Sequence, residues 1–420
     1  MTATTILILA DDLSGAADCA VACAKAGLQA RVCLDAACAQ TPVEALAVDL
    51  DTRQQTQDQA RAATLAAKGL LAPGAVLYRK IDSTLRGHIG AELAATLQIA
   101  GEGAFVIVCP AYPVMGRTVW GGEVFVRGAP LSETEIWRHE GHGQADLSAM
   151  LASAGLETVE IPLAAVRGAD LAAALRDAVA QGAKALICDA ETEADLAAIT
   201  AAGLTMPGAV WAGSGGMAIP LAAALSPRPY APAPVPQRGP GPILVVAGSA
   251  SSVSRRQLEE LGRDPGVIAI RISPAVLLEG PGGPGWRPAS RSLVAAIGKP
   301  GKDVVVAAID PEAPVDPANG SRLAAALGKL IGPQLSRFGA LAATGGETAR
   351  SLLEAAGGHS LKLQREVEPG IPLSSLEDND LPVITKAGAF GDPLSLVRCV
   401  EALRALPLAP KGVSGALPPP

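Results

Sequence analysis

The sequence contains few aromatic residues, no long apolar run and no excess of positive charge. Aromatic residues make up 3% of the chain and hydrophobic residues 49%, so aliphatic side chains must fill the core. No run of 18 or more apolar residues occurs, and the sequence therefore predicts no membrane span. A net charge of −7 argues against a nucleic-acid partner, which would need a basic face. The composition is that of a globular protein with neither a membrane nor a nucleic-acid partner.

The cysteines lack the spacing of a metal site. Seven cysteines occur without a Cys-x-x-Cys pair, so zinc binding is not predicted. Cys19 and Cys23 fall in an Ala-rich helical segment, where cysteine behaves as a small apolar residue. The residues before Asp11 include no basic segment, which is not typical of a signal peptide. We therefore expect a cytoplasmic protein whose thiols, including Cys33 and Cys38, are reduced.

A Pro-rich stretch divides the chain. Residues 226–242 cannot join a helix or a sheet, and we interpret them as an extended linker. A chain of 420 residues favours two domains of roughly 150–250 residues each. The linker separates an expected domain over 1–225 from another over 243–407, and residues 408–420 are expected to form a disordered tail.

Both halves alternate short apolar runs with helical segments, which predicts two Rossmann-like α/β domains with largely parallel sheets and a cleft between them. The strands expected in the first half are Ile6–Leu9, Ala30–Leu34, Ala45–Asp49, Ala75–Arg79, Ala104–Val108, Lys184–Cys188 and Ala209–Trp211. Those expected in the second half are Ile243–Ala247, Val267–Ile270, Val304–Ile309, Leu341–Ala343 and Val383–Thr385. Ligands of such sheets bind beyond the carboxyl ends of the strands, so the polar residues that follow each strand are the candidates for a site.

Two adjacent carboxylates follow the first expected strand. Asp11 and Asp12 precede Ser14 and Gly15 at a helix start. A helix N-cap needs only one carboxylate, so the pair favours a site over a plain cap. One carboxylate could orient or deprotonate a substrate hydroxyl while the other holds the loop.

A dense polar turn follows the strand Ala75–Arg79. Lys80 and Arg86 could bind a carboxylate, because a guanidinium suits bidentate contact. Asp82 and Ser83 could form hydrogen bonds with sugar hydroxyls. The alternative is a solvated turn with a Ser/Thr cap.

Two more arginines follow expected strands. Arg53 ends the segment Asp51-Thr-Arg and is another candidate for contact with an anion. Arg117 follows a loop fixed by prolines and a glycine; on its own it fits a surface salt bridge as well as a ligand contact. The segment His139-Glu-Gly-His lacks the spacing of a helical zinc motif, and no metal ligand is predicted.

The second half has no Gly-x-x-x-x-Gly-Lys-Ser/Thr loop, but three other Gly/Ser/Thr-rich turns follow its strands. They begin at Gly248, Thr344 and Lys386. Exposed amides at a helix start, together with the positive end of the helix dipole, bind anions. One such turn could be a plain tight turn, whereas three together predict a nucleotide site. The candidate residues are Ser249, Ser251, Gly345, Gly346, Glu347, Thr348 and Gly388.

The order of these motifs resembles the four-carbon acid sugar kinase family, whose members phosphorylate threonate, erythronate or 3-oxo-tetronate at the 4-hydroxyl with ATP. The segments that carry the resemblance are 10–16, 51–53, 80–87, 110–117, 213–216, 248–251, 344–348, 369–372 and 386–391.

The resemblance implies a kinase that uses ATP, with Mg²⁺ expected to neutralise the phosphates. It implies that the first half binds the sugar acid through Asp12, Arg53, Lys80, Asp82, Ser83 and Arg86, to which the residue pattern adds Asp11 and Arg117. Asp12 is the preferred general base. The second half would bind ATP through the three glycine-containing turns.

Some alternatives stay open. The segment Ile136–Gly143 departs from the family pattern, so the exact acid is open and another small hydroxy acid is an alternative substrate. An NAD-dependent oxidoreductase would carry glycines after the first strand, where Asp11 and Asp12 would repel a pyrophosphate. A solute-binding protein would normally need export. A homodimer is also left open.

Overall fold

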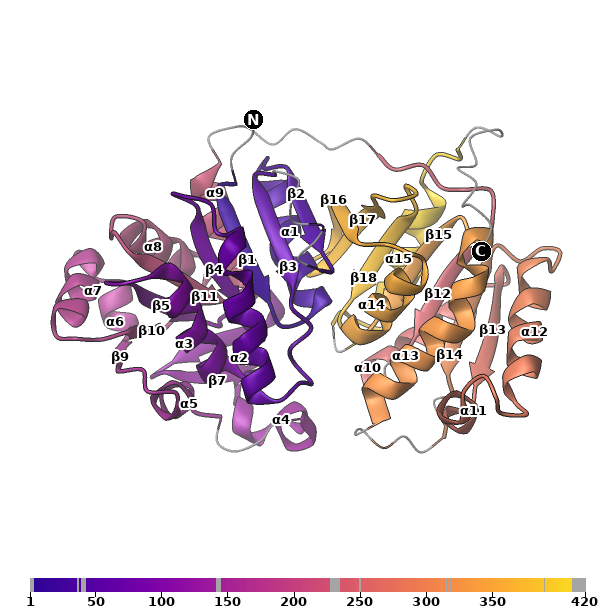
Figure 1. Cartoon of the computed structure of the whole chain (residues 1–420), viewed down its shortest axis with the longest axis horizontal. Coiled ribbons are helices and arrows are strands. Elements are labelled where there is room, and N and C mark those ends of the chain that lie inside the picture. The colour runs from indigo at the N-terminus through magenta and orange to yellow at the C-terminus, as the bar shows by residue number, and fades with distance from the viewer. Residues whose placement is uncertain are drawn as a thin grey trace. The chain divides into compact units, whose positions relative to one another are not determined.

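The chain folds into two units, which we describe separately. The computed structural model describes residues 4–35, 38, 43–140, 145–226, 235–248, 251–310, 312–313, 316, 319–388 and 390–409. The N-terminal unit is Met1–Ala231 and the C-terminal unit is Pro232–Pro420 (Figure 1). Within the described ranges, no helix has both the length and the apolar character that a membrane span requires.

A parallel sheet forms the centre of the N-terminal unit. Its strands are β1 (Ile6–Ala10), β2 (Ala30–Cys33), β3 (Ala45–Asp49), β4 (Val76–Lys80), β5 (Phe105–Cys109), β9 (Thr158–Ile161), β10 (Ala185–Cys188) and β11 (Ala209–Gly213). Their order is β2-β3-β1-β4-β11-β5-β10-β9, and every neighbouring pair is parallel. β1 is buried along its whole length, as expected of a strand covered on both faces.

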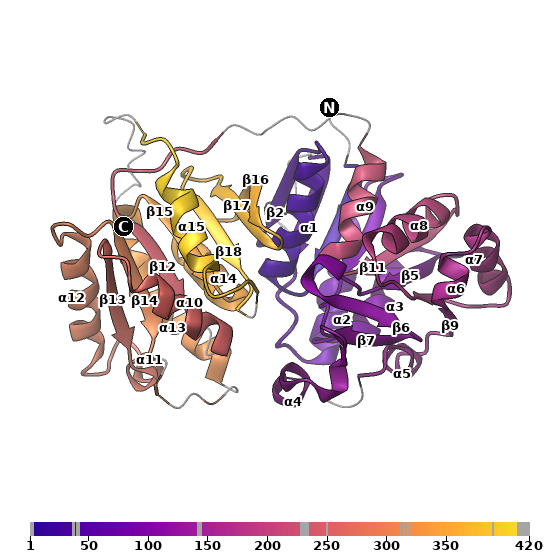
Figure 2. The same cartoon turned by 180° about the vertical axis from the view of Figure 1, so that it is seen from behind.

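Helices cover both faces of this sheet. They are α1 (Leu13–Lys25), α2 (Gln57–Ala66), α3 (Ile89–Ala100), α4 (Glu135–Glu140), α5 (Leu147–Ser153), α6 (Leu163–Val166), α7 (Leu171–Ala180), α8 (Glu193–Gly203) and α9 (Gly215–Leu225). Figures 1 and 2 show α2 and α3 on one face and α1, α8 and α9 on the other. A small antiparallel sheet joins β6 (Arg117–Trp120), β7 (Glu123–Val126) and β8 (Ala129–Pro130).

The C-terminal unit has a mixed sheet. Its strands are β12 (Ile243–Ala247), β13 (Val267–Ile272), β14 (Val304–Ile309), β15 (Ala340–Thr344), β16 (Ser360–Glu368), β17 (Ile371–Leu376) and β18 (Pro382–Lys386). In the order β13-β14-β12-β15-β18-β17-β16, the first five strands are parallel and β17 is antiparallel to both of its neighbours.

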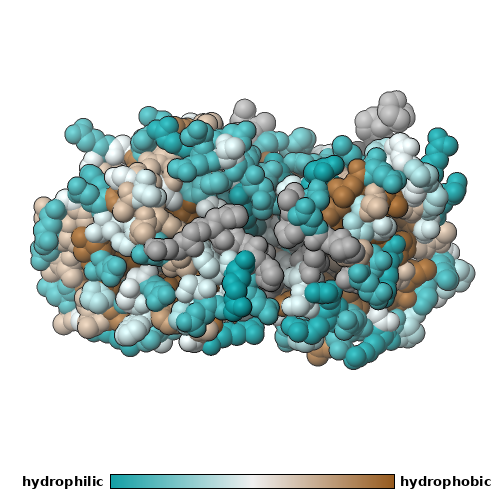
Figure 3. Space-filling view, turned by 90° about the horizontal axis from the view of Figure 1, so that it is seen from below, coloured by the Kyte–Doolittle hydropathy of each residue, from teal (hydrophilic) through white to brown (hydrophobic). Residues whose placement is uncertain are grey.

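The helices of the C-terminal unit are α10 (Ser252–Leu261), α11 (Pro274–Glu279), α12 (Trp286–Ile297), α13 (Gly320–Ile331), α14 (Gly346–Ala355) and α15 (Ser395–Arg404). Aliphatic residues of β12, β14, β15 and β18 pack against α10 and α15 in one core. Figure 3 shows mostly hydrophilic and neutral residues on the face that it presents, since the apolar side chains are largely inside.

The prediction of two α/β domains with largely parallel sheets is confirmed, and every expected strand overlaps a strand of the structure. The sequence did not predict β9, the small sheet, or the hairpin of β16 and β17. β16 alternates apolar with charged residues, and β17 contains a proline and two serines, so neither forms the apolar run that marks a buried parallel strand.

The expectation of reduced thiols is wrong for Cys33 and Cys38, which form a disulfide. Cys33 ends β2, and the two Cα atoms lie 5.7 Å apart, within the range that a disulfide requires. The Asp35 carboxylate accepts a hydrogen bond from the Cys38 amide at 2.9 Å. The closeness of the two residues in the folded chain, rather than a recognisable cysteine motif, allows the pair to form.

The end of α8 provides a test of core packing. A Cβ on Gly203 would lie 2.5 Å from Ile107 Cδ1 and 2.6 Å from Trp211 Cη2, and Trp211 is 1% exposed. In a helix, alanine is more favourable than glycine by about 0.8–1 kcal/mol. Overpacking of a rigid core costs about 1–3 kcal/mol, and this cost outweighs the gain in helix propensity. We expect Gly203→Ala to lower the free energy of unfolding by about 1 kcal/mol, measured by urea titration.

Gly69→Ala is the matched control, because a Cβ there would have no atom within 4 Å. It should leave the free energy of unfolding nearly unchanged. Equal stability of the two variants would contradict the packing described for α8.

Candidate functional site

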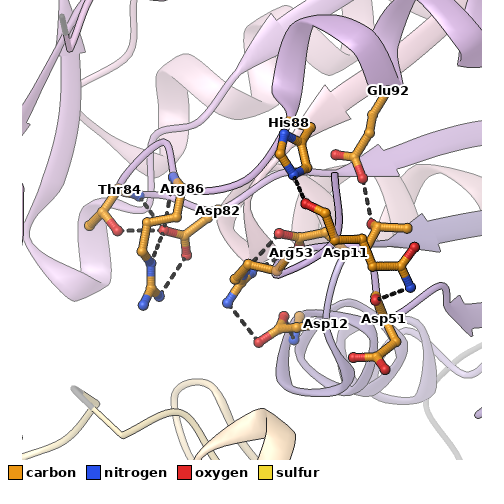
Figure 4. Close-up of polar contacts among 12 residues, drawn as sticks. Asp11, Asp12, Asp51, Arg53, Asp82, Thr84, Arg86, His88 and Glu92 are labelled. Carbon is orange, nitrogen blue, oxygen red and sulfur yellow. Dashed lines mark hydrogen bonds and ion pairs between the residues drawn. The ribbon is translucent and has the colours of Figure 1, made fainter. Parts of the chain in front are cut away.

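Three neighbouring strands of the N-terminal unit end at one edge of the sheet. Ala10 of β1 lies opposite Asp49 of β3 and Lys80 of β4 in the parallel register. The loops that follow these strands therefore meet, and Figure 4 shows their side chains pointing toward one another. This is the edge at which ligands bind in open α/β sheets.

Arg53 holds both adjacent carboxylates. Its Nε and Nη2 donate to the two oxygens of Asp11 at 2.7 and 2.9 Å, and its Nη1 donates to Asp12 Oδ2 at 2.8 Å (Figure 4). The backbone amides of Thr52 and Arg53 also donate to the Asp11 carbonyl, which fixes the loop. In this structure Arg53 thus faces carboxylates of the protein itself.

The two carboxylates differ in their surroundings. Asp11 is 2% exposed, whereas the Asp12 side chain is 15% exposed. Burial acts to raise the pKa of Asp11, but the charge and hydrogen bonds of Arg53, helped by Lys80, hold that pKa below its ordinary value. Asp11 is therefore an ionised interior anchor, and Asp12 is the member of the pair that a ligand can reach.

Asp12 also caps a helix. Its Oδ1 accepts a hydrogen bond from the Gly15 amide at 2.8 Å at the start of α1. The plain N-cap role considered for this residue is therefore real. An ionised carboxylate has about four acceptor positions, and the bonds from Gly15 and Arg53 leave room for a substrate hydroxyl.

Lys80 lies beside Asp12 because Gly15 has no side chain. A Cβ on Gly15 would lie 2.8 Å from Asp12 Oδ1 and 2.9 Å from Lys80 Nζ. Lys80 is buried, and no hydrogen bond or ion pair of its ammonium occurs among the residues that the structure describes. A buried cation in this state favours the binding of an anionic ligand.

Asp82 and Arg86 form the opposite side of the site. Arg86 Nε and Nη2 donate to the two oxygens of Asp82 at 2.7 and 3.2 Å, and the Thr84 hydroxyl donates to the same carboxylate. Burial opposes ionisation of Asp82, but Arg86 and Arg53 together hold its pKa well below the ordinary value. Gly87, at φ +91°, lets the turn approach Asp11, since a Cβ there would lie 2.9 Å from Asp11 Oδ2.

Two further predicted residues lie in the same region. Ser83 is buried next to Asp82 in the turn. Arg117 begins β6 and is buried; burial lowers the pKa of its guanidinium, which also responds to the charges of Asp82 and Arg86. The structure thus gathers the predicted residues of the first half at one edge of the sheet.

Behind this site lies a set of buried contacts that no sequence motif predicts. The Thr52 hydroxyl donates to Glu92 Oε1 at 2.5 Å, and Glu92 forms an ion pair with Arg79, which is 0% exposed. His88 Nε2 lies 2.6 Å from the Gln55 carbonyl oxygen. These contacts fix the loop that carries Arg53. In the sequence, Glu92 looks like an ordinary acidic residue in the first turn of a helix.

The three glycine-containing turns of the C-terminal unit also share one edge of a sheet, because β12, β15 and β18 are adjacent and parallel. Gly345 adopts φ +100° and its amide donates to the Lys386 carbonyl at 2.7 Å. Ser251 caps α10, and its hydroxyl donates to the Gly388 carbonyl at 2.9 Å.

The remaining candidates of this unit belong to the start of α14 or to a neighbouring turn. Gly346 and Glu347 lie in its first turn, and buried Thr348 packs so closely against Gly248 that a Cβ on Gly248 would collide with the Thr348 hydroxyl. The predicted residue Ser249 lies outside the described residues.

Comparison with known proteins identifies the family. A model described as Sugar-binding N-terminal domain matches residues 6–221, and one described as Nucleotide-binding C-terminal domain matches residues 244–396. The chain is 44% identical over 415 residues to a D-threonate kinase of Cupriavidus necator, which covers 94% of this chain and 97% of that protein. The chain belongs to the four-carbon acid sugar kinase family. The resemblance inferred from the motifs is therefore confirmed.

Other relatives are more distant. A 3-oxo-tetronate kinase of Cupriavidus necator is 30% identical over 419 residues, which cover 92% of this chain and 94% of that protein. A solved structure from Salmonella typhimurium LT2 matches with a TM-score of 0.77 at 21% identity, covering 94% of this chain and 98% of that chain. The structural match shows that the fold is shared.

Replacing Arg53 should reverse how stability depends on pH. In the native protein Asp11 has a lowered pKa, so its contribution is present above the unfolded pKa and is lost as pH falls through the folded value. In Arg53→Met burial dominates and raises the folded pKa, so stability is lost as pH rises. We expect the variant to lose about 3–5 kcal/mol at about pH 8 and less at about pH 5.

Urea unfolding at the two pH values measures this difference. Arg61→Met is the matched control, because Arg61 is exposed on α2 and donates a hydrogen bond to the Gln98 side chain at 3.3 Å rather than to a buried carboxylate. An equal loss at both pH values would show that Arg53 does not control the ionisation of Asp11.

Proposed function

We propose that the protein transfers the terminal phosphoryl group of ATP to the 4-hydroxyl of a four-carbon sugar acid. The observation that carries this proposal is the gathering of Asp12, Lys80 and Arg86 at one sheet edge in a chain of this family. The Asp12 carboxylate, which a ligand can reach, stands beside the buried amino group of Lys80. Such a pair suits a molecule that carries both a hydroxyl and a carboxylate.

The carboxylate of the substrate is assigned to Lys80, with Arg86 and Arg117 nearby. Arg53 is already engaged with Asp11 and Asp12, so it serves to hold these acids rather than to bind the substrate in this state. Asp82 and Ser83 stand where they can accept hydrogen bonds from the other hydroxyls. D-threonate is the first candidate, because the relative with that name shares 44% identity with the chain.

Asp12 is the proposed general base. Its carboxylate accepts the proton of the attacking hydroxyl, while Arg53 and the Gly15 amide keep it in place. Phosphoryl transfer asks the protein mainly for positioning and charge stabilisation. The fixed geometry of the loops meets that demand.

The C-terminal unit is the proposed ATP site. The starts of α10 and α14 direct helix dipoles toward the edge at which Gly345, Gly388 and Ser251 lie. Among the described residues, no cluster of three His, Cys, Asp or Glu side chains could hold a metal. Mg²⁺ usually keeps several waters and binds through one or two carboxylates and the substrate phosphates, so an ion delivered with ATP fits this chain. The use of ATP places the proposed reaction in the cytoplasm.

A coupled assay of ADP release tests the function. We expect ATP-dependent turnover with D-threonate, D-erythronate or 3-oxo-tetronate, and phosphorus NMR should locate the phosphate on the 4-hydroxyl. NAD with the same acids serves as the control and should give no reduction. If the protein binds ATP but turns over none of these acids, its substrate is not a four-carbon sugar acid of this group.

Asp12→Asn removes the base but keeps the helix cap, because the asparagine oxygen can accept from the Gly15 amide as Asp12 Oδ1 does, whereas its NH2 cannot accept the hydrogen bond that Arg53 Nη1 donates to Oδ2. We expect kcat to fall by about 10²–10⁴-fold, with a much smaller change in KM and a melting temperature lowered only by the lost bond to Arg53. Asp58→Asn, on the exposed face of α2, is the control. Near-normal turnover of Asp12→Asn would remove Asp12 from the role of base.

A further inference from the structure

Lys386 ends β18 next to a glycine-rich loop, where a lysine would ordinarily be interpreted as a phosphate ligand. The structure places it differently. Lys386 is 1% exposed, and its Nζ donates to the carbonyl oxygens of Ala387, Phe390 and Gly388 at 2.8, 3.1 and 3.4 Å. An ammonium has three donors, and the loop itself occupies all of them.

Helix α10 binds the same loop carbonyls from inside the unit. The hydroxyls of Ser251 and Ser254 both donate to the Gly388 carbonyl at 2.9 Å. Gln257 Nε2 donates to the carbonyls of Phe390 and Asp392 at 3.0 and 2.8 Å. The carbonyls of the loop are therefore turned toward the interior.

The direction of the carbonyls determines the direction of the amides. In a planar trans peptide, the C=O group and the N–H of the next residue point in opposite directions. The inward carbonyls of Ala387 and Phe390 thus turn the N–H groups of Gly388 and Gly391 away from Lys386. Gly391 adopts φ +85°, and a Cβ there would collide with the Ser395 hydroxyl. Backbone N–H groups of one loop that point to the same side make a site for an anion.

We propose that Lys386 is a positioning residue for the nucleotide, which holds the loop carbonyls inward so that the N–H groups of Gly388 and Gly391 bind the ATP phosphates. Gly391 thereby joins the nucleotide ligands. The inference rests on the proposed ATP site of the C-terminal unit. In this proposal Lys386 binds the carbonyl oxygens of the loop and does not contact a phosphate.

The way Lys386 holds the loop depends on pH, because it depends on the charge of the Lys386 amino group. Burial lowers the pKa of Lys386 to about 8, and the neutral amine has one donor fewer than the ammonium. The thiol of Cys399 on α15 stays neutral there, because burial raises its pKa to about 12. From α10, only uncharged side chains contact the loop carbonyls. Arg398 is paired with Glu368 and Asp392.

Titration calorimetry of the full chain with ATP and Mg²⁺, at about pH 7 and about pH 9.5, provides the first test. We expect the Kd of ATP to rise about tenfold between the two values, since one charged hydrogen bond is lost. The Kd of D-threonate should not follow this change. Lys386→Met should show the weakened ATP binding already at about pH 7 and no further change with pH. Lys329→Met, exposed on α13, is the control and should behave as the native protein.

A double-mutant cycle with Ser254→Ala separates positioning from direct contact. Ser254 and Lys386 donate to the same Gly388 carbonyl, so their effects on the Kd of ATP should be non-additive. Additive effects would mean that Lys386 touches the phosphate directly and would overturn the inference.

The remaining outcomes are also decisive. ATP binding that is unchanged in Lys386→Met and across pH overturns this inference but leaves the proposed function standing. No ATP binding at either pH overturns the proposed function, and this inference with it. If Lys386→Met does not fold, as judged by circular dichroism, the measurements on the native protein at the two pH values decide. A Kd of ATP that is the same at both pH values then overturns the proposal.

Discussion

Two carboxylates on consecutive residues repel each other, and the Arg53 guanidinium between Asp11 and Asp12 is the interaction on which the rest of the site depends. It joins the loops after β1 and β3 and holds the pKa of Asp11 below its ordinary value although Asp11 is buried. The parallel register makes it possible, since β1 and β3 end next to each other. The buried hydrogen bond of Thr52 with Glu92 and the ion pair of Glu92 with Arg79 also hold this loop.

The two units use different chemical groups to hold the loops that follow their strands. Each must hold an irregular loop rigidly at the carboxyl end of a parallel strand, where no ladder of hydrogen bonds is available. In the N-terminal unit, charged side chains bind one another, either between neighbouring loops or within one loop. In the C-terminal unit, Lys386 and side chains of α10 bind the backbone of the loop. The first arrangement presents side-chain charges, whereas the second turns the loop carbonyls toward the interior.

Much of this could be predicted from the sequence, because apolar runs and terminal glycines are local signals. They predicted the parallel strands of both units and the polar residues that follow them. The partners of those residues could not be predicted. That Arg53 faces Asp11, or that Lys386 faces its own loop, depends on side-chain directions that only the folded chain defines. The same holds for the Cys33–Cys38 disulfide, which depends on how close the folded chain brings the two Cα atoms.

Gly15 has a consequence for how sequence variation in this protein should be interpreted. Its missing side chain leaves the space that Asp12 Oδ1 and Lys80 Nζ occupy, and any Cβ would enter it. A glycine that takes no part in the chemistry is therefore under the same constraint as the acid and the lysine beside it. In a scan of all substitutions, a loss of activity on replacing Gly15 would reflect the lack of space beside Asp12 and Lys80, and not a catalytic role of Gly15.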